Sequence, residues 1–204
     1  MKFPTFLRLV LFCVCCLLPG IASAQSTILV FGDSLSAAYG LPREAGWVNL
    51  LQIELQHSHP QYRVVNASIS GETTAGGLQR IAAALRQHQP DIVILELGAN
   101  DGLRGTSLAD AEVNLAELIR KSLQAKAKVL LVGMQLPPNY GMDYTARFKD
   151  MYPKLSRQYH VALVPFILEG FVQEQFQADN LHPAAQVQPI ILRRVLQNLT
   201  PLLK

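Results

Sequence analysis

The sequence has 204 residues, of which 50% are hydrophobic and 16% are charged, so it can build one substantial hydrophobic core but hardly two. The formal net charge is only +3 and the basic residues form no stripe, which argues against nucleic acid as a partner. The three cysteines, Cys13, Cys15 and Cys16, all precede residue 25. Residues 25–204 therefore contain no disulfide framework, cysteine nucleophile or thiolate metal site.

The beginning of the chain has the pattern of a secretory signal peptide. Lys2 and Arg8 precede an apolar run over residues 9–18, and Ala22-Ser23-Ala24 fits a small-x-small cleavage site. We therefore expect residues 1–24 to be removed and residues 25–204 to be exported as a single domain. An uncleaved membrane anchor is the alternative, but an apolar core this short spans a bilayer poorly, so we expect no stable membrane span in the mature form.

Apolar runs alternate with segments of helical spacing along residues 25–204. This alternation is typical of an α/β domain with a parallel sheet covered on both faces. In such a domain the carboxyl ends of the strands meet at one edge, where a ligand site is expected. The predicted strands are 27–31, 62–67, 91–97, 128–133 and 161–166, and the predicted helices are 47–57, 75–87, 109–125, 144–159 and 184–199.

Ser34 follows the first predicted strand, in Gly32-Asp33-Ser34-Leu35, where we expect a buried strand to meet a helix. A serine hydroxyl becomes a useful nucleophile when a base accepts its proton. His182, after the fifth strand, is the candidate base, and Asp179 stands three positions before it to orient its ring. Taken alone, Asp179 is equally well explained as a helix cap and His182 as a surface histidine.

Acyl transfer also needs donors for the negative oxygen of its tetrahedral intermediate. Three groups at the same edge qualify: the backbone N–H groups of Ser34 and Gly71, and the side-chain amide of Asn100. Judged singly, Gly71 and Asn100 are also ordinary turn residues. Only their combination favours an oxyanion hole.

Neither a metal nor a cofactor is predicted. His57 and His59 are close enough in sequence to suggest a metal pair, but solvent exposure at a helix end explains them better.

Four segments in chain order together resemble the SGNH, or GDSL, hydrolase family. They are Gly32-Asp33-Ser34-Leu35-Ser36 and residues 66–71, 96–105 and 179–183. The four residues after which the family is named match Ser34, Gly71, Asn100 and His182. Residues 136–141 and 152–155 are similar to a bacterial periplasmic group of this family, described as thioesterase I, lysophospholipase and arylesterase.

The resemblance implies a flavodoxin-like three-layer α/β/α sandwich with a five-stranded parallel sheet. It also implies that Ser34 is the nucleophile, His182 the base and Asp179 its orienting acid, with Ser34, Gly71 and Asn100 as oxyanion donors. The implied location is the periplasm, with secretion to the medium as the alternative. An α/β-hydrolase is disfavoured, because Ser36 stands where its nucleophile motif requires a second glycine.

We expect a monomeric serine esterase or thioesterase that acts on fatty acyl esters and lysophospholipids, and on acyl-CoA in vitro. Two loops at the catalytic edge are expected to form an apolar wall for the acyl chain. The alternatives are a carbohydrate O-deacetylase of the same family and a non-catalytic binding module. The candidate substrate-binding residues are Leu103, Leu136, Pro137, Asn139, Tyr140 and Met142.

Overall fold

The computed structural model describes residues 25–203. The expected signal peptide, residues 1–24, lies outside these residues. Five parallel strands form one sheet in the order β2-β1-β3-β4-β5. Their bounds are β1 (Ser26–Gly32), β2 (Tyr62–Asn66), β3 (Ile92–Glu96), β4 (Lys128–Val132) and β5 (Ala162–Val164).

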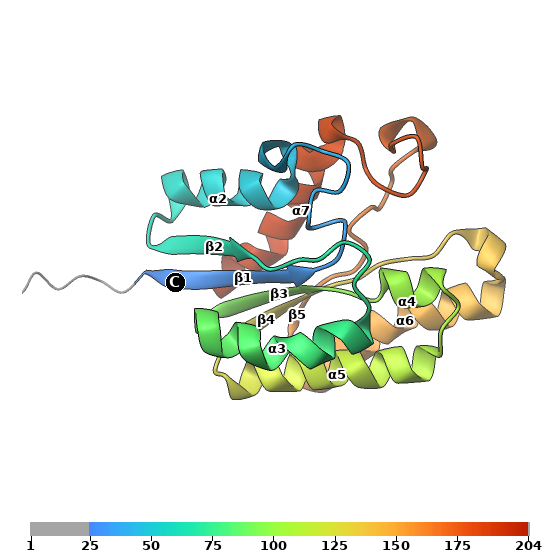
Figure 1. Cartoon of the computed structure of the whole chain (residues 1–204), viewed down its shortest axis with the longest axis horizontal. Coiled ribbons are helices and arrows are strands. Elements are labelled where there is room, and N and C mark those ends of the chain that lie inside the picture. The colour runs from blue at the N-terminus through green and yellow to red at the C-terminus, as the bar shows by residue number, and fades with distance from the viewer. Residues whose placement is uncertain (1–24, 204) are drawn as a thin grey trace, which may run out of the picture.

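Helices cover both faces of the sheet, which gives three layers (Figure 1). One face carries α2 (Trp47–Ser58) and α7 (Gln188–Leu199), and the other carries α3 (Thr74–His88), α5 (Leu108–Gln124) and α6 (Met142–Tyr159). The expected three-layer α/β/α sandwich with five parallel strands is confirmed. None of the helices within residues 25–203 has both the length and the hydrophobicity needed to cross a membrane.

Side-chain alternation along β1 builds both layers of the core. Leu29 and Phe31 pack into the cluster beneath α3, α5 and α6, whereas Ile28 and Val30 pack into the cluster beneath α2 and α7. All four side chains are fully buried. A central parallel strand is buried on both faces, which explains why its sequence is continuously apolar.

Three local features differ from the sequence predictions. No regular helix follows Ser34, because residues 34–40 form successive turns before a 3-10 turn and α2. The last helix begins at Gln188 rather than at residue 184, after a 3-10 turn over Ala185–Val187, because Pro189 favours the first turn of an α-helix. The third difference is an additional short helix, α4 (Ala99–Leu103), which directly follows β3.

The strand order places a crevice between β1 and β3. From β1 the chain crosses to β2 on one side and then returns to β3 on the other, so the loops after β1 and β3 run in opposite directions. Ligands of doubly wound sheets bind at such a switch point, at the carboxyl ends of the strands. Ser34 follows β1 and Asn100 lies in α4 after β3, so these two residues flank the crevice.

Candidate active site

Ser34, His182 and Asp179 form a continuous chain of hydrogen bonds. The Nε2 atom of His182 lies 2.8 Å from Ser34 Oγ, and its Nδ1 atom lies 2.6 Å from Asp179 Oδ2. An ionised carboxylate can only accept a hydrogen bond, so Nδ1 must carry a hydrogen. When the ring is neutral, the lone pair of Nε2 then faces the serine hydroxyl, which is the arrangement a general base requires.

The environment of Asp179 favours its ionised form. Partial burial opposes ionisation, but the backbone N–H groups of His182 and Leu181 and the His182 ring outweigh it and lower the Asp179 pKa to about 2. Both N–H groups donate to Oδ1 at 3.0 Å, while Oδ2 faces the ring. One carboxylate therefore shapes the loop and orients the histidine at the same time.

A small antiparallel hairpin holds the loop that carries Asp179 and His182. Phe176 and Pro183 form an isolated bridge, and Gln177 N donates to the carbonyl of His182 at 2.7 Å. The Gln177 side chain donates to the carbonyl of Tyr39, in the turn after Ser34, at 2.9 Å. This contact ties the base to the nucleophile turn across 138 residues of sequence.

Tyr39 also covers the base directly. Its ring centroid lies 4.5 Å from that of His182, with the two planes tilted by 37°.

Asn100 is placed by the first turn of α4. The helix begins after Gly98, whose φ of +116° is suited to glycine, and a Cβ there would lie 2.5 Å from the hydroxyl of Tyr152. The Asn100 amide donates to Asp33 Oδ2 at 3.1 Å. Burial raises the pKa of Asp33 to about 6, although hydrogen bonds from Leu35 and Asn100 and the charge of His182 oppose this shift.

Gly71 lies at the third position of a tight turn. Glu72 N donates to Ile69 O at 3.1 Å and Gly71 has a φ of +78°, whereas Ser70 is not among the residues with positive φ. This is the pattern of a type II turn, which favours glycine at that position. The hydrogen bond that closes the turn uses the N–H of Glu72, not that of Gly71, and Gly71 lies on the wall of the cavity that Ser34 faces.

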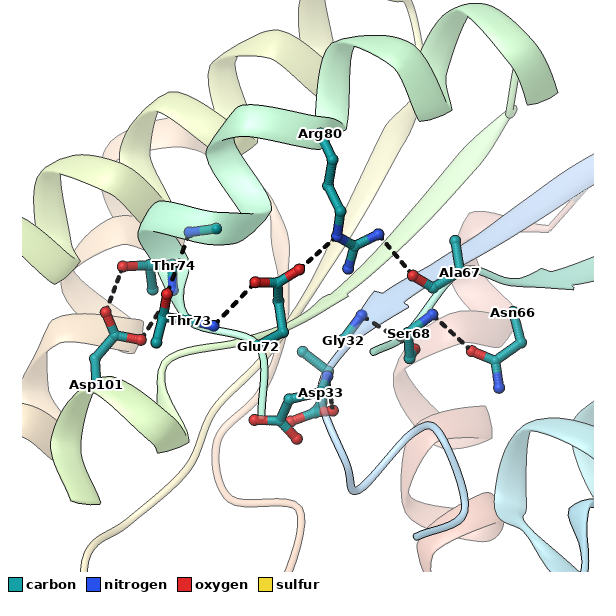
Figure 2. A network of polar contacts seen from close by, with 12 residues as sticks. Gly32, Asp33, Asn66, Ala67, Ser68, Glu72, Thr73, Thr74, Arg80 and Asp101 are labelled. Carbon is teal, nitrogen blue, oxygen red and sulfur yellow. Dashed lines mark hydrogen bonds and ion pairs between the residues drawn. The ribbon is translucent and has the colours of Figure 1, made fainter. Parts of the chain in front are cut away.

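A polar network fixes the segment that carries this turn (Figure 2). Arg80 reaches from α3 to donate to Glu72 Oε2 at 2.6 Å and to the carbonyl of Ala67 at 2.7 Å. Thr74 donates to both carboxylate oxygens of Asp101, from its N–H at 2.9 Å and from its hydroxyl at 2.7 Å. Asp101 directly follows Asn100, so the same network links the two candidate oxyanion segments.

A further contact joins these segments. Arg104, which caps α4, donates from Nη2 to the carbonyl of Gly71 at 2.9 Å. The position of Gly71 is thus coupled to that of Asn100 on the same short helix.

Ser34 and His182 line a cavity of about 620 Å³ whose walls are largely apolar. The structure brings Ser34, Gly71, Asn100, His182, Leu103, Leu136 and Pro137 together around it. Of the other candidate substrate-binding residues, Asn139, Tyr140 and Met142 lie outside the cavity lining. Met142 begins α6 and is 86% exposed, and the Tyr140 hydroxyl instead donates to the carbonyl of Leu103 at 3.0 Å.

Sequence reasoning missed the second apolar wall of the cavity. This wall comes from the segment after β5 and from the loop that carries Asp179 and His182. Residues 165–184 form a long connection with only one 3-10 turn, and connections of this length within a domain are often functional, so its length was an available signal. The residues of this wall are Phe166, Leu168, Phe171, Phe176 and Leu181.

Within residues 25–203, no three His, Cys, Asp or Glu side chains are grouped so that they could hold a metal ion. The chemistry available at the site is that of a hydrogen-bonded serine, histidine and carboxylate beside amide donors.

Comparison with known proteins places this site in a family. A model of the GDSL-like lipase/acylhydrolase family matches residues 30–188. The chain is 51% identical over 183 residues to the esterase TesA of Pseudomonas aeruginosa, which covers 89% of this chain and 91% of that protein. It is 42% identical over 183 residues to thioesterase 1/protease 1/lysophospholipase L1 of Escherichia coli K12, with 89% and 86% of the two chains covered. A crystal structure of TesA matches with a TM-score of 0.85 and 52% identity, over 87% of this chain and 100% of that chain. These findings confirm the family resemblance: the chain belongs to the GDSL-like lipase/acylhydrolase family, the SGNH hydrolases, and is an esterase.

Proposed function

We propose that Ser34 attacks the carbonyl carbon of an acyl ester or thioester while His182 takes the hydroxyl proton. The tetrahedral intermediate collapses to an acyl-Ser34 ester as His182 returns the proton to the leaving alcohol or thiol. Water, activated by the same histidine, then hydrolyses the acyl-serine. Asp179 keeps the proton on Nδ1 and stabilises the imidazolium formed in each step. The observation that carries this proposal is the hydrogen-bonded chain of these three residues at the wall of an apolar cavity.

The oxyanion donors in this mechanism are the N–H groups of Ser34 and Gly71 and the amide of Asn100. They come from the segments that follow β1, β2 and β3, and Gly71 and Asn100 lie on the wall of the same cavity as Ser34. Donors fixed in advance stabilise charge without reorganising during the reaction.

The proposed substrates are fatty acyl esters, with lysophospholipids as the natural class in the cell envelope and acyl-CoA as a thioester substrate in vitro. Two apolar walls support this choice. One contains Leu103, Leu136 and Pro137, and the other contains the phenylalanines that follow β5. An acetyl group would leave most of this cavity empty, whereas an acyl chain would bury apolar surface against both walls.

The test is hydrolysis of p-nitrophenyl esters from acetyl to palmitoyl by purified residues 25–204, measured beside Ser34→Ala. We expect turnover to be highest for a medium or long acyl chain. We expect Ser34→Ala to lose on the order of 10³-fold or more in kcat. Circular dichroism and the thermal midpoint establish that both proteins are folded.

Other outcomes would change the proposal in defined ways. Activity confined to acetyl esters would favour an O-deacetylase. Folded wild-type protein as inactive as Ser34→Ala on every ester would contradict the serine mechanism.

We further propose that residues 25–204 are the exported, monomeric mature enzyme and that it resides in the periplasm. The first strand begins at Ser26, two positions after the expected cleavage site, which supports removal of residues 1–24 without loss of the fold. N-terminal sequencing of the periplasmic fraction tests the cleavage site and location, and light scattering on the purified protein tests the oligomeric state. Cytoplasmic retention or a dimer mass would contradict the respective proposal.

A further inference from the structure

Two buried carboxyl groups lie beside the proposed catalytic residues but take no part in the steps above. Asp33 has a relative exposure of 0% and Glu96 of 2%, although both are acidic. We propose that Asp33 and Glu96 share a single proton and together position the Asn100 amide for the oxyanion. This inference rests on the proposed function, because it assigns the two residues to the support of the oxyanion hole.

The fold leaves a specific space for the Glu96 carboxyl group. Gly32, the last residue of β1, pairs with Glu96, the last residue of β3. A Cβ on Gly32 would lie 2.6 Å from Glu96 Oε2 and 2.8 Å from Ser36 Oγ. A glycine therefore stands where any other side chain would displace the carboxyl group.

Burial and proximity favour a proton on one of the two acids. Asp33 N donates to Glu96 Oε2 at 3.3 Å, so the two acidic residues are neighbours, and both side chains are buried. Charging both groups in a buried site would be costly, because no solvent screens their repulsion.

The positions of the surrounding donors assign the charge to Asp33 and the proton to Glu96, because both Asp33 oxygens accept hydrogen bonds whereas both donors to Glu96 reach the same oxygen, Oε2. Asp33 Oδ1 accepts from Leu35 N at 3.0 Å and Oδ2 accepts from the Asn100 amide at 3.1 Å. The charge on His182 when its ring is protonated also favours ionised Asp33. The neutral acid, Glu96, accepts from Ser36 Oγ at 2.7 Å and from Asp33 N at 3.3 Å.

The Asp33 charge also affects the pKa of one further buried group, Tyr152. Burial, with a further contribution from the charges of Asp33 and Asp101, raises the Tyr152 pKa well above its usual value, so Tyr152 is neutral. Its hydroxyl donates to the carbonyl of Leu97 at 3.1 Å.

The Asp33 charge determines which way the Asn100 amide faces. The amide nitrogen carries two hydrogens, of which one is directed to Asp33 Oδ2 and the other is available for the oxyanion. If the side chain flipped, its carbonyl oxygen would face the Asp33 carboxylate and repel it. Asp33 and Glu96 are thus positioning residues that act through Asn100.

A double-mutant cycle tests this coupling. We measure kcat and KM for p-nitrophenyl butyrate with the wild type, Asp33→Asn, Asn100→Ala and the double variant. Asn100→Ala is expected to lose about 100- to 1,000-fold in kcat. Asp33→Asn is expected to lose about 10- to 100-fold in kcat, with KM changed by less than about 3-fold. In the Asn100→Ala background, Asp33→Asn should cost less than about 3-fold.

Losses that multiply in the double variant would overturn the inference, because Asp33 would then act independently of Asn100. Ser34→Ala is measured in parallel to separate this failure from failure of the proposed function. If Ser34→Ala retains activity, the mechanism itself is wrong. If it is inactive and the losses multiply, only the positioning role is wrong.

An infrared measurement tests the proton without relying on the activity of a variant. At about pH 8, where exposed carboxyl groups are ionised, wild-type protein should retain the band of a protonated carboxylic acid. Glu96→Gln should lose that band, and its amide oxygen can still accept from Ser36 Oγ and Asp33 N, so it should also lose less kcat than Asp33→Asn. Absence of the band in the wild type, or its persistence in Glu96→Gln, would overturn the assignment.

Ser122→Ala is a matched control for loss of a buried polar contact. Ser122 is fully buried on α5 and donates to the carbonyl of Leu118 at 2.8 Å. We expect this variant to lower the thermal midpoint while keeping the wild-type kcat. A comparable kcat loss in Ser122→Ala would show that general destabilisation explains Asp33→Asn, and would overturn the inference.

Discussion

At the scale of single residues, Asp179 combines two tasks in one carboxylate. Oδ1 accepts two backbone N–H groups and shapes the loop, and Oδ2 accepts from the His182 ring. The two oxygens make separate contacts, so a substitution that alters only one of them can separate loop structure from proton transfer.

Asp179→Asn is such a substitution. Its Oδ1 can still accept from Leu181 and His182, but its NH₂ group would face Nδ1 and force the ring to hold its proton on Nε2. That tautomer cannot accept the proton of Ser34. We expect kcat to fall on the order of 10²- to 10⁴-fold with KM little changed, in steady-state assays on p-nitrophenyl butyrate.

The control for this substitution is Asp150→Asn, which neutralises an exposed carboxylate on α6. It should keep the wild-type kcat. An Asp179→Asn enzyme with more than about a tenth of the wild-type kcat would show that Asp179 does not set the tautomer.

At the scale of elements, the type II turn at Gly71 is the part of the proposed oxyanion hole most sensitive to backbone conformation. A Cβ on Gly71 would have space, since its nearest contact is Arg104 Nη2 at 3.5 Å. The φ of +78° is therefore what disfavours alanine at this position. We expect the substituted segment to adopt a different type of turn, in which the N–H of residue 71 is displaced.

We expect Gly71→Ala to lose on the order of 10-fold or more in kcat and about 1 kcal/mol of stability. Gly105→Ala is the matched control, because Gly105 has a φ of +64° and a Cβ there meets no atom of the described chain within 4 Å. Both variants are compared by urea unfolding and by kcat. Equal loss of kcat in the two would show that backbone strain, and not the position of the Gly71 N–H, limits the reaction.

Periodic apolar patterns explain why the main elements were predictable from the sequence. Each predicted strand is within three residues of the observed one at either end. The central strands β1, β3 and β4 are buried almost throughout and are therefore continuously apolar, whereas the edge strands β2 and β5 are only partly buried. The residues of the site were also predictable, since they follow strands whose carboxyl ends share one edge. The resemblance to the SGNH hydrolases matched these residues to the motifs of that family in chain order.

Features that depend on tertiary contacts were not predictable in this way. The helix α4 has five residues, begins directly after a glycine and contains another, so its sequence is typical of a loop. It forms because Asn100 and Asp101 are hydrogen-bonded to Asp33 and Thr74. The wall formed by Phe166, Phe171 and Phe176 comes from a segment without periodicity, whose position depends on the hairpin at Phe176 and on Arg194, which donates to the carbonyl of Ile167.

At the scale of the whole molecule, the buried acids oppose stability while the two hydrophobic clusters provide it. Burial raises the pKa of Asp33 to about 6, and burial followed by the Asp33 charge raises the pKa of Glu96 well above its usual value. An acid whose pKa is raised by folding binds more protons in the native state than in the unfolded state. Its contribution to stability is therefore lost as pH rises from the unfolded pKa through the folded pKa.

Glu96→Gln should accordingly become more stable relative to the wild type as pH rises. Above about pH 4.5 the unfolded wild type releases both protons, whereas the native state still holds that of Glu96. The difference in unfolding free energy should grow by up to about 1.4 kcal/mol per pH unit, measured by urea unfolding at steps from about pH 5 to 8. Ser122→Ala, which removes a buried hydroxyl without titrating, should differ from the wild type by an amount independent of pH. A Glu96→Gln curve parallel to the wild type would mean that Glu96 is already ionised in the native protein, and that the oxyanion hole is supported by two charges rather than one.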